Sequence, residues 1–297
     1  MTHDTRWLVV NNPRAGSGRD HAGAVAAALD RIPIDYELVT PGDIPTLEAI
    51  IAAAAAGGVT RFAVAGGDGT ANLALNALMA LPWTEPPVLS ILPTGSGSDF
   101  IRTFALPRTL EGAAGVLVGD RVYRCDVGLV HGSFGSRYFL NALDVGIAAA
   151  AVRIGRRLPR WMGSLRYQAA FWMALPGFPA APVEVDLGRR RIAGDAINVV
   201  VANGQFFGGG LNIAPQAALM DGLLDVEVFR CSRRHAFSLM PRVVRGHHLR
   251  HRAVARGRLA EGSITAPEHW PVEVDGELLG TGSVRIEVVP GAIDFKI

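Results

Sequence analysis

One stretch decides the fold of the N-terminal part of the chain: Arg61-Phe62-Ala63-Val64-Ala65-Gly66-Gly67-Asp68-Gly69-Thr70-Ala71-Asn72. Its apolar beginning predicts a short buried strand, its glycines predict a tight turn, and residues 73–81 predict a helix. Such a turn lets backbone N–H groups at the helix N-terminus approach a phosphate closely. The carboxylate of Asp68, in the middle of the turn, would repel a bare phosphate. We therefore expect Asp68 to face a cation or to handle a proton or hydroxyl group, the alternative being a plain cap of the helix.

Strands and helices alternate on either side of this stretch, which predicts a mostly parallel sheet covered by helices on both faces. We expect strands at 7–11, 34–39 and 88–92, and helices at 21–30, 46–56, near 99–103 and at 110–119. In open parallel sheets, ligands bind beyond the carboxyl ends of the strands. The loops that should converge at this edge are 12–16, Thr40, 66–72 and 94–99.

The pattern changes near residue 124 to short strands at regular spacing, which predicts a sandwich-like second domain. We expect strands at 121–130, 137–145, 183–187, 197–202, 224–229, 264–266, 272–274 and 284–289, with helical stretches at 147–175 and 233–244. The fold class is therefore α/β, with an N-terminal doubly wound, mostly parallel sheet and a C-terminal β-sandwich-like domain with a helical insert. The predicted domains are 1–124, which binds nucleotide, and 125–289, with the tail 290–297 packing back on the first.

Composition excludes several classes of protein. The net charge of the 297 residues is only +2, so charge gives no argument for a nucleic-acid partner. Lys296 is the only lysine, which excludes a P-loop lysine or a lysine Schiff base unless Lys296 itself serves. Cys125 and Cys231 make no disulfide framework, so we expect a reduced, cytoplasmic setting. No signal peptide or membrane-spanning segment is predicted, and the absence of Gly-x-Ser-x-Gly argues against a hydrolase.

Taken together, the motifs resemble the diacylglycerol kinase catalytic-domain family of soluble bacterial lipid kinases. In the first half they are Asn12-Pro13 with Gly16, Gly66-Gly67-Asp68-Gly69-Thr70, and Pro93-Thr94-Gly95-Ser96-Gly97-Ser98-Asp99-Phe100 with Arg102. In the second half they are 201–204, 208–210, 215–225 and Asp275-Gly276-Glu277. The resemblance covers nearly the whole chain and implies an NAD-kinase-like first domain and an ATP-dependent kinase acting on diacylglycerol or a related lipid.

The resemblance also implies roles for single residues. The expected ATP contacts are Asn12, Pro13, Arg14, Ala15, Gly16, Thr40, Gly66, Gly67, Asp68, Gly69, Thr70, Ala71, Asn72 and Ser96. A structural Mg²⁺ would be held by the backbone carbonyls of Ala218 and Leu223 and the carboxylate of Asp221. Glu277 would accept the proton of the lipid hydroxyl. Asp68 and Asp99 would lie around the catalytic Mg²⁺ and the phosphates, together with Asp126.

Two positions depart from the family pattern. The loop after the fourth strand is usually Gly-Thr-x-Asn-Asp, whereas here it is Gly95-Ser96-Gly97-Ser98-Asp99. Ser96 keeps the hydroxyl group of threonine, but Ser98 lacks an amide that could donate two hydrogen bonds. Arg14 stands where small polar residues are commoner, and it could add charge against a phosphate. The departures concern the geometry of the loop and not the reaction.

Two basic segments give information about the binding partners of the protein. The segment 153–162 combines arginines with Trp161 and precedes several aromatic residues, which is typical of a helix at the surface of an anionic membrane. The alternative is an ordinary helix pair with an apolar core face. The run 245–252, with Arg256 and Arg258, predicts a solvated basic edge, because it lacks the carboxylate or cysteine partners of a zinc site. The sequence is compatible with either a monomer or a homodimer.

Two alternatives to a lipid kinase follow from the same residues. An NAD kinase would share the loop Gly66–Thr70 but would not need the basic aromatic segment. A nucleotide-responsive, lipid-binding regulatory protein without turnover is the second alternative, and the serine at position 98 favours it. A kinase assay over a lipid panel separates the three.

Overall fold

Two compact units make up the computed structural model of the chain, which describes residues 4–13, 21–94, 99–159, 162 and 165–297. Unit 1 comprises Met1–Cys125 together with Gly291–Ile297, and unit 2 comprises Asp126–Pro290. The chain passes from one unit to the other within β5 (Val122–Gly132) and again within β18 (Val284–Lys296).

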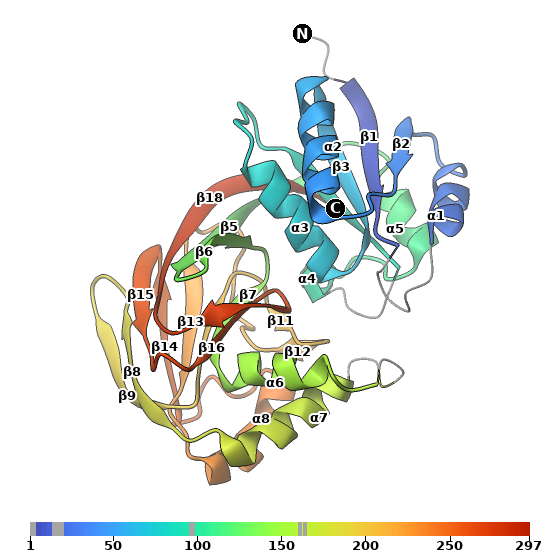
Figure 1. The fold of residues 1–297 in the computed structure, drawn as a ribbon. Helices are drawn as coiled ribbons and strands as arrows, with labels where there is room; N and C mark the ends of the chain where they lie inside the picture. Colours follow the sequence, from blue (N-terminus) through green and yellow to red (C-terminus); the bar gives the residue numbers. More distant parts are fainter. Residues whose placement is uncertain (1–3, 14–20, 95–98, 160–161, 163–164) are drawn as a thin grey trace. The chain divides into compact units, whose positions relative to one another are not determined.

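Unit 1 is a parallel sheet with helices on both faces (Figure 1). The strand order is β2 (Tyr36–Val39), β1 (Asp4–Asn11), β3 (Val59–Gly66), β4 (Val88–Pro93) and the end of β18, and each neighbouring pair is parallel. Helix α2 (Ile44–Ala56) packs with α3 (Asp68–Met79), and α1 (Ala22–Leu29) packs with α5 (Leu110–Val116). The short helix α4 (Asp99–Thr103) follows β4. This confirms the predicted doubly wound, mostly parallel sheet.

Local chemistry explains several element boundaries in unit 1. The carboxylate of Asp43 accepts a hydrogen bond of 2.9 Å from the backbone N–H of Thr46, and Pro45 lies in the first turn, so α2 begins two residues before the predicted start. Gly119 has a positive φ of 82°, which stops continuation of α5 to the predicted residue 119. Lys296 is buried and donates to the backbone carbonyl of Arg121 (2.9 Å), so the single lysine ties the C-terminal strand to unit 1.

Unit 2 is a sandwich of mainly antiparallel strands, to which the described residues add the α-helices α6, α7 and α8. One sheet has the order β14 (Val254–Leu259), β13 (Leu224–Phe229), β10 (Asn198–Ala202), β7 (Ala142–Gly146), β16 (Pro271–Val274), β17 (Glu277–Thr281). The other contains β18, β15 (Glu261–Thr265), β8 (Ala181–Asp186) and β9 (Arg191–Ala196), with β5 paired to β6 (Gly135–Phe139). A separate hairpin pairs β11 (Phe206–Phe207) with β12 (Leu211–Asn212).

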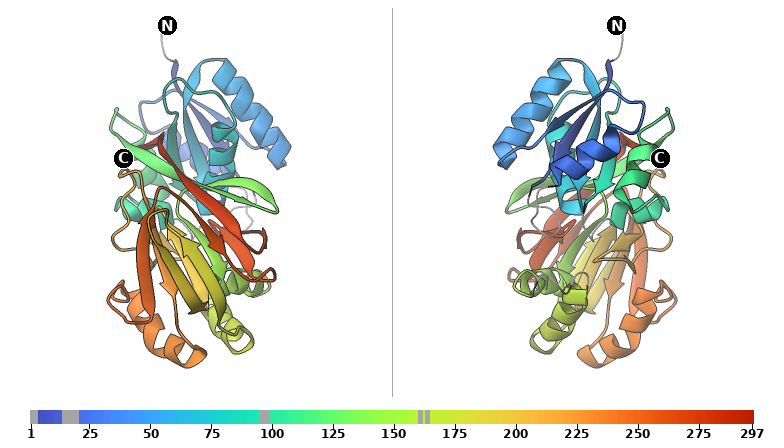
Figure 2. Two further views of the ribbon diagram at one scale, coloured as in Figure 1. Left: turned by 90° about the vertical axis from the view of Figure 1, so that its left-hand side faces the viewer. Right: turned by 90° about the vertical axis from the view of Figure 1, so that its right-hand side faces the viewer.

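The six-stranded sheet of unit 2 is buried on both faces. Val199 and Val201 belong to the core between the two sheets, whereas Val200 belongs to a second core on the opposite face. That second core is completed by α6 (Ile147–Gly155), α7 (Leu165–Ala174) with the 3-10 turn η2 (Leu175–Gly177), and α8 (Arg233–Val244). Figure 2 shows these helices gathered together in the lower part of unit 2. The helical insert therefore covers a sheet face that would otherwise meet solvent.

Three expectations for the second half were wrong in detail. Residues 137–145 were expected as one strand but form β6 and β7 in different sheets, because the N–H groups of Leu140, Asn141 and Ala142 donate to the carboxylate of Asp275. The strands β9 and β14 were not expected. The basic run after residue 245 is not simply a solvated edge: His248 is fully buried, and residues 254–259 form β14.

In the part of the chain that the structure describes, no helix has the length and apolar character needed to cross a membrane.

Candidate active site

The carboxyl edge of the unit 1 sheet brings together polar side chains from three loops. Asn12 donates a hydrogen bond of 2.9 Å from Nδ2 to Oγ1 of Thr70, in the first turn of α3. Its neighbour Asn11, at the end of β1, is fully buried and donates to Oγ1 of Thr40 at 3.2 Å. The predicted residues Asn12, Thr40 and Thr70 thus share one edge. Asn11 was not predicted, although its place at the end of an apolar strand was a signal.

The glycine turn is built around the side chain of Thr70. A Cβ atom added at Gly66 would collide with that side chain, so position 66 needs a residue without one. Helix α3 begins at Asp68 after Gly67, and within the described residues no side chain caps it. An uncapped helix N-terminus after a glycine turn presents N–H groups and the positive end of the helix dipole to an anion.

The carboxylate of Asp68 contacts the start of helix α4 rather than its own helix. Its Oδ2 accepts from the backbone N–H of Asp99 at 2.8 Å, and its Oδ1 accepts from that of Phe100 at 3.1 Å. The carboxylate therefore satisfies two N-terminal donors of α4. Asp99 itself is buried and lies 3.2 Å from Nε of Arg102. Asp68 thus fixes the start of helix α4, where Asp99 lies.

Some predicted nucleotide contacts cannot be placed. Arg14, Ala15, Gly16 and Ser96 lie outside the described residues. Their contact with ATP, like that of the other predicted residues, stays a prediction.

In unit 2, the predicted metal ligands meet at the loop before β13. Asp126 accepts a hydrogen bond of 2.7 Å from the backbone N–H of Gly222, and Asp221 accepts one of 3.1 Å from that of Leu223. Arg258 lies 3.3 Å from carboxylate oxygens of both Asp221 and Asp225, so a guanidinium group already faces this loop. Among the described residues, no cluster of three or more His, Cys, Asp or Glu side chains has metal-binding geometry. A metal here would depend on backbone carbonyls, as in the predicted set.

Glu277 lies at the start of β17, directly after a tight turn. Asp275 and Gly276 both have positive φ values, 46° and 89°, which is the conformation of a two-residue hairpin turn. The buried carboxylate of Asp275 accepts three backbone hydrogen bonds of 2.8–3.0 Å. The half-exposed carboxylate of Glu277 pairs with Nη2 of Arg137 at 2.6 Å. Arg137, which was not predicted, therefore holds the orientation of Glu277.

A row of buried carboxyl groups crosses the six-stranded sheet on its helix-facing side. Glu273 of β16 lies opposite Asp144 of β7, and Val200 of β10 separates Asp144 from Glu227 of β13. Burial raises the pKa of Asp144 to about 7, against the opposing hydrogen bond from Asn198. Burial, and then the charge of Asp144, raises the pKa of Glu273 well above its usual range. These carboxyl groups were not predicted to be important.

The third member of the row has a different partner. Burial raises the pKa of Glu227, but its contact with His248 acts in the opposite direction. Nε2 of the fully buried His248 lies 2.8 Å from Oε2 of Glu227 and 2.9 Å from the carbonyl oxygen of Ile213. Glu227 therefore has His248 as a partner inside unit 2, although Nδ1 of His248 has none among the described residues. Asp144 and Glu273 each retain one oxygen without a partner among the described residues.

Helices α7 and α8 expose large apolar side chains. Leu165, Met173 and Phe237 are 62%, 58% and 63% exposed, and the ring of Phe237 stacks on that of Trp172 with centroids 4.7 Å apart. Arg153 and Arg157 on the neighbouring α6 segment are exposed. Exposed apolar side chains together with exposed arginines suit the surface of an anionic membrane.

Two families match the chain along its length. The diacylglycerol kinase catalytic domain matches residues 6–130, and the YegS C-terminal NAD kinase beta sandwich-like domain matches residues 141–296.

The curated relatives agree with these matches. A diacylglycerol kinase of Mycobacterium tuberculosis is 30% identical over 292 residues, which cover 96% of this chain and 92% of that one. A protein of Yersinia enterocolitica named "Probable lipid kinase YegS-like" is 30% identical over 245 residues, 82% of this chain and 81% of that one. The crystal structure of a diacylglycerol kinase from Bacillus anthracis has the same fold, with a TM-score of 0.72, 22% identity and coverage of 100% and 98%.

Proposed function

The chain belongs to the lipid kinases that join a diacylglycerol kinase catalytic domain to a YegS C-terminal domain, as its motifs predicted, and from this membership we propose that it phosphorylates diacylglycerol. In the reaction, the free hydroxyl oxygen of the lipid forms a bond to the γ-phosphorus of ATP. The bond from that phosphorus to the bridging oxygen breaks, and ADP leaves. The hydroxyl proton goes to the carboxylate of Glu277. The products are a phosphorylated lipid and ADP.

One observation carries the nucleotide part of this proposal: the two hydrogen bonds from Asp68 to the N–H groups of Asp99 and Phe100. They join the first residue of α3 to the first residues of α4, which supports the proposal that the two family motifs form one phosphate-binding edge. Asn12 and Thr40 add side-chain donors and acceptors from two further strands. Phosphoryl transfer depends mainly on positioning and charge, which a rigid edge of this kind supplies.

Mg²⁺ is the metal that this family implies, and the donor set suits it in chemical type. Asp221 and the backbone carbonyls of Ala218 and Leu223 would supply only oxygen ligands, which Mg²⁺ prefers. Arg258, 42% exposed, is a competing cation for the same carboxylate. When bound, the metal would supply positive charge that fixes the loop before β13, with Asp126 holding that loop through Gly222. A second Mg²⁺ would arrive with ATP and neutralise its phosphates.

Glu277 suits the role of proton acceptor because the protein orients its carboxylate. The ion pair with Arg137 fixes one oxygen, and the hairpin turn at Asp275 and Gly276 fixes the backbone. The carboxylate remains 41% exposed, so a substrate hydroxyl can reach it. General acid–base catalysis by a positioned side chain contributes about 10²- to 10⁴-fold to a rate.

The test compares two glutamates of unit 2 that both pair with arginine. Glu277→Gln should lower kcat on diacylglycerol by roughly 10²- to 10⁴-fold with an unchanged KM for ATP. The control Glu261→Gln removes the partner of Arg285 and should leave turnover unchanged. Radiolabelled ATP and mixed micelles of diacylglycerol provide the assay, with NAD as a competing acceptor. Normal turnover by Glu277→Gln would disprove the base assignment, and lipid binding without ATP consumption would favour a regulatory protein.

The exposed apolar and basic surface of α7 and α8 supports a peripheral contact with an anionic membrane. A lipid with long chains has to be taken from a bilayer, and Leu165, Met173 and Phe237 can insert into its interface. Arginines near the surface would add about 1 kcal/mol each on anionic lipid. Transient membrane binding of a cytoplasmic enzyme is therefore part of the proposal.

A further inference from the structure

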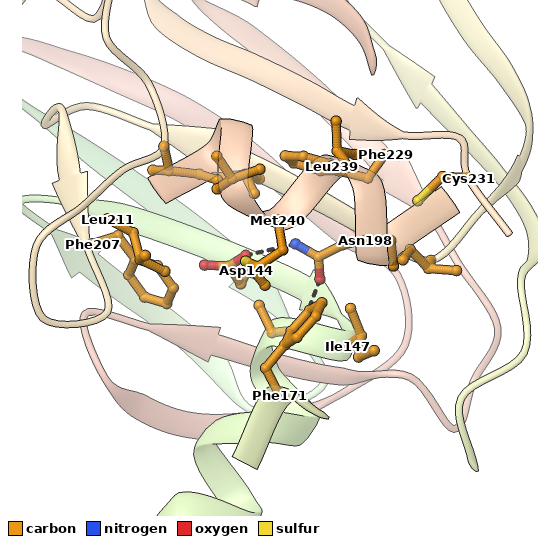
Figure 3. Close-up of a pocket in the computed structure, with 16 residues that line it drawn as sticks. Asp144, Ile147, Phe171, Asn198, Phe207, Leu211, Phe229, Cys231, Leu239 and Met240 are labelled. Carbon is orange, nitrogen blue, oxygen red and sulfur yellow. Dashed lines mark hydrogen bonds between the residues drawn. The ribbon is translucent and has the colours of Figure 1, made fainter. Parts of the chain in front are cut away.

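An apolar pocket lies in unit 2 between the six-stranded sheet and its helices (Figure 3). Its walls come from α6, α7, α8 and the β11–β12 hairpin, through Ile147, Phe171, Leu239, Met240, Phe207 and Leu211. The empty volume is about 550 Å³, including the side open to solvent. The lining of the pocket is therefore that of a site for a hydrocarbon chain.

A single carboxyl group interrupts this lining. Among the described residues that line the pocket, only Asp144 carries a carboxyl group, and its side chain is completely buried. Its Oδ1 accepts a hydrogen bond of 2.8 Å from Nδ2 of Asn198. The amide of Asn198 is fixed in turn, because its Oδ1 accepts from the backbone N–H of Ala148 at 3.0 Å. Oδ2 of Asp144 has no partner among the described residues.

The surroundings determine which form of Asp144 the pocket presents. Burial favours the neutral carboxyl group and raises its pKa, and the charge of Glu227 adds to this effect. Because Oδ1 already accepts from Asn198, the proton of the neutral form belongs on Oδ2. The pocket then contains one hydroxyl donor in an apolar wall. A buried donor without an acceptor is costly, so a ligand that brings an acceptor is favoured over one that does not.

The exposed residues around the pocket indicate where its ligand comes from. Phe237 and Trp172, which stack on one another, belong to the helices α8 and α7 that wall the pocket. Met173, on the same helix α7, is also largely exposed. A membrane that contacts these side chains delivers long-chain lipids directly to the helices of the pocket.

We propose that this pocket binds one acyl chain of the lipid substrate and that the Asp144 carboxyl group donates a hydrogen bond to the carbonyl oxygen of its ester. The inference rests on the proposed function in one respect, that the substrate is a lipid. Among possible lipid substrates, it predicts a preference for those with acyl-ester chains over those with only alkyl or prenyl chains. An alkyl chain would fill the same volume and leave the donor of Asp144 unpaired.

The test uses two lipids that differ only in the carbonyl groups. A short-chain diacylglycerol and the dialkyl ether of glycerol with the same chain length are compared as substrates of the wild-type protein. We expect a preference for the ester in kcat/KM of roughly tenfold to a hundredfold, the usual consequence of an unpaired buried donor. Asp144→Leu removes the donor, so its preference should fall to about one.

Two further variants distinguish a specific contact from general damage. Asp144→Asn keeps an acceptor for Asn198 and places an N–H donor in the pocket, so it should retain the preference for the ester. Glu227→Gln changes another buried carboxyl group of the same sheet face that does not line the pocket, and its ester preference should equal that of the wild type. Circular dichroism verifies that each variant is folded.

Binding of the two lipids without ATP, measured by titration calorimetry, separates this inference from the proposed function. If the wild-type protein phosphorylates neither lipid but binds the ester more tightly, the kinase proposal on diacylglycerol fails and the pocket assignment stands. Equal binding of ester and ether by the wild-type protein would overturn the inference. An Asp144→Leu variant that keeps the full preference for the ester would also overturn it.

Discussion

Replacing Asp144 by asparagine should stabilise the protein more at high pH than at low pH. The folded-state pKa of Asp144 is raised from 3.8 to about 7, because the carboxyl group is buried beside Glu273 and Glu227. Between these two values the folded state binds a proton that the unfolded state releases. The free energy of unfolding of the wild-type protein therefore falls as pH rises from about 4 to about 7, and above that the full cost remains.

The magnitude follows from the size of the pKa shift. Three pKa units correspond to about 4 kcal/mol at 1.36 kcal/mol per unit. Part of this cost is already present at pH 5, so the advantage of Asp144→Asn should grow by about 2–3 kcal/mol between about pH 5 and about pH 8. The loss of the Asp144 charge also relieves the repulsion that raises the pKa of Glu273, which acts in the same direction. His248, Arg156 and Arg256 remain in both proteins and cancel in the comparison.

Urea unfolding of the wild-type protein and of the variant at both pH values measures this effect. The relevant quantity is the difference between the two proteins, since titrating groups remote from Asp144 contribute equally to both, and Glu273 changes in the same direction as Asp144. Asp120→Asn is the matched control, because Asp120 pairs with Arg61 but is 88% exposed, and such surface pairs contribute little. A stability gain for Asp144→Asn that is the same at both pH values would refute the assignment of a neutral, buried Asp144.

Three other predictions test the remaining parts of the site. Gly66→Ala should cost about 1–3 kcal/mol of stability and raise the KM for ATP, because its Cβ would collide with Thr70. The control Gly69→Ala has open space at its Cβ and should leave stability unchanged, so an equal loss of stability in both variants would contradict the explanation. Asp275→Asn should cost about 1.5–3 kcal/mol in urea unfolding, since the amide cannot accept all three backbone hydrogen bonds, and unaltered stability would show that they are dispensable. Mg²⁺ should raise the melting temperature of the wild-type protein but not that of Asp221→Asn. In Arg258→Met the same rise should occur at a lower Mg²⁺ concentration, because the competing guanidinium group is gone. Equal shifts of the melting temperature in all three proteins would place the metal elsewhere.

The parts of the fold set by local chemistry could be predicted from the sequence. Helix α8 and strand β13 were expected with the bounds that the structure gives, Arg233–Val244 and Leu224–Phe229. The convergence of Asn12, Thr40 and Thr70 followed from the rule that parallel strands end at one edge. These features depend on residues close in sequence or on the topology of the sheet.

Contacts between residues far apart in sequence could not be predicted in the same way. Arg137 and Glu277 are separated by 140 positions, and no pattern in either segment indicates the other. The break between β6 and β7 depends on Asp275, which is more than 130 residues away. The mostly apolar stretch 137–145 favours one strand, and only a distant acceptor for its N–H groups divides it. Asp68 is a related case, because its partners lie at the start of α4, about 30 residues away.

The alternation of apolar and acidic residues predicts the strands of the six-stranded sheet correctly, but it gives no sign that helices cover their acidic face. Glu273 stands between Val272 and Val274, and Glu227 stands between Val226 and Val228, an alternation that is typical of a strand with one solvated face. The strands are where the pattern predicts, but α6, α7 and α8 cover the polar face. Acids retained on a covered face lose their hydration and gain little for stability. Glu227 recovers part of that loss through His248, whereas Asp144 has an open oxygen beside an apolar pocket. An acid kept there at a cost to stability is best explained by a ligand that completes its hydrogen bonding, and the ester of an acyl chain supplies that acceptor.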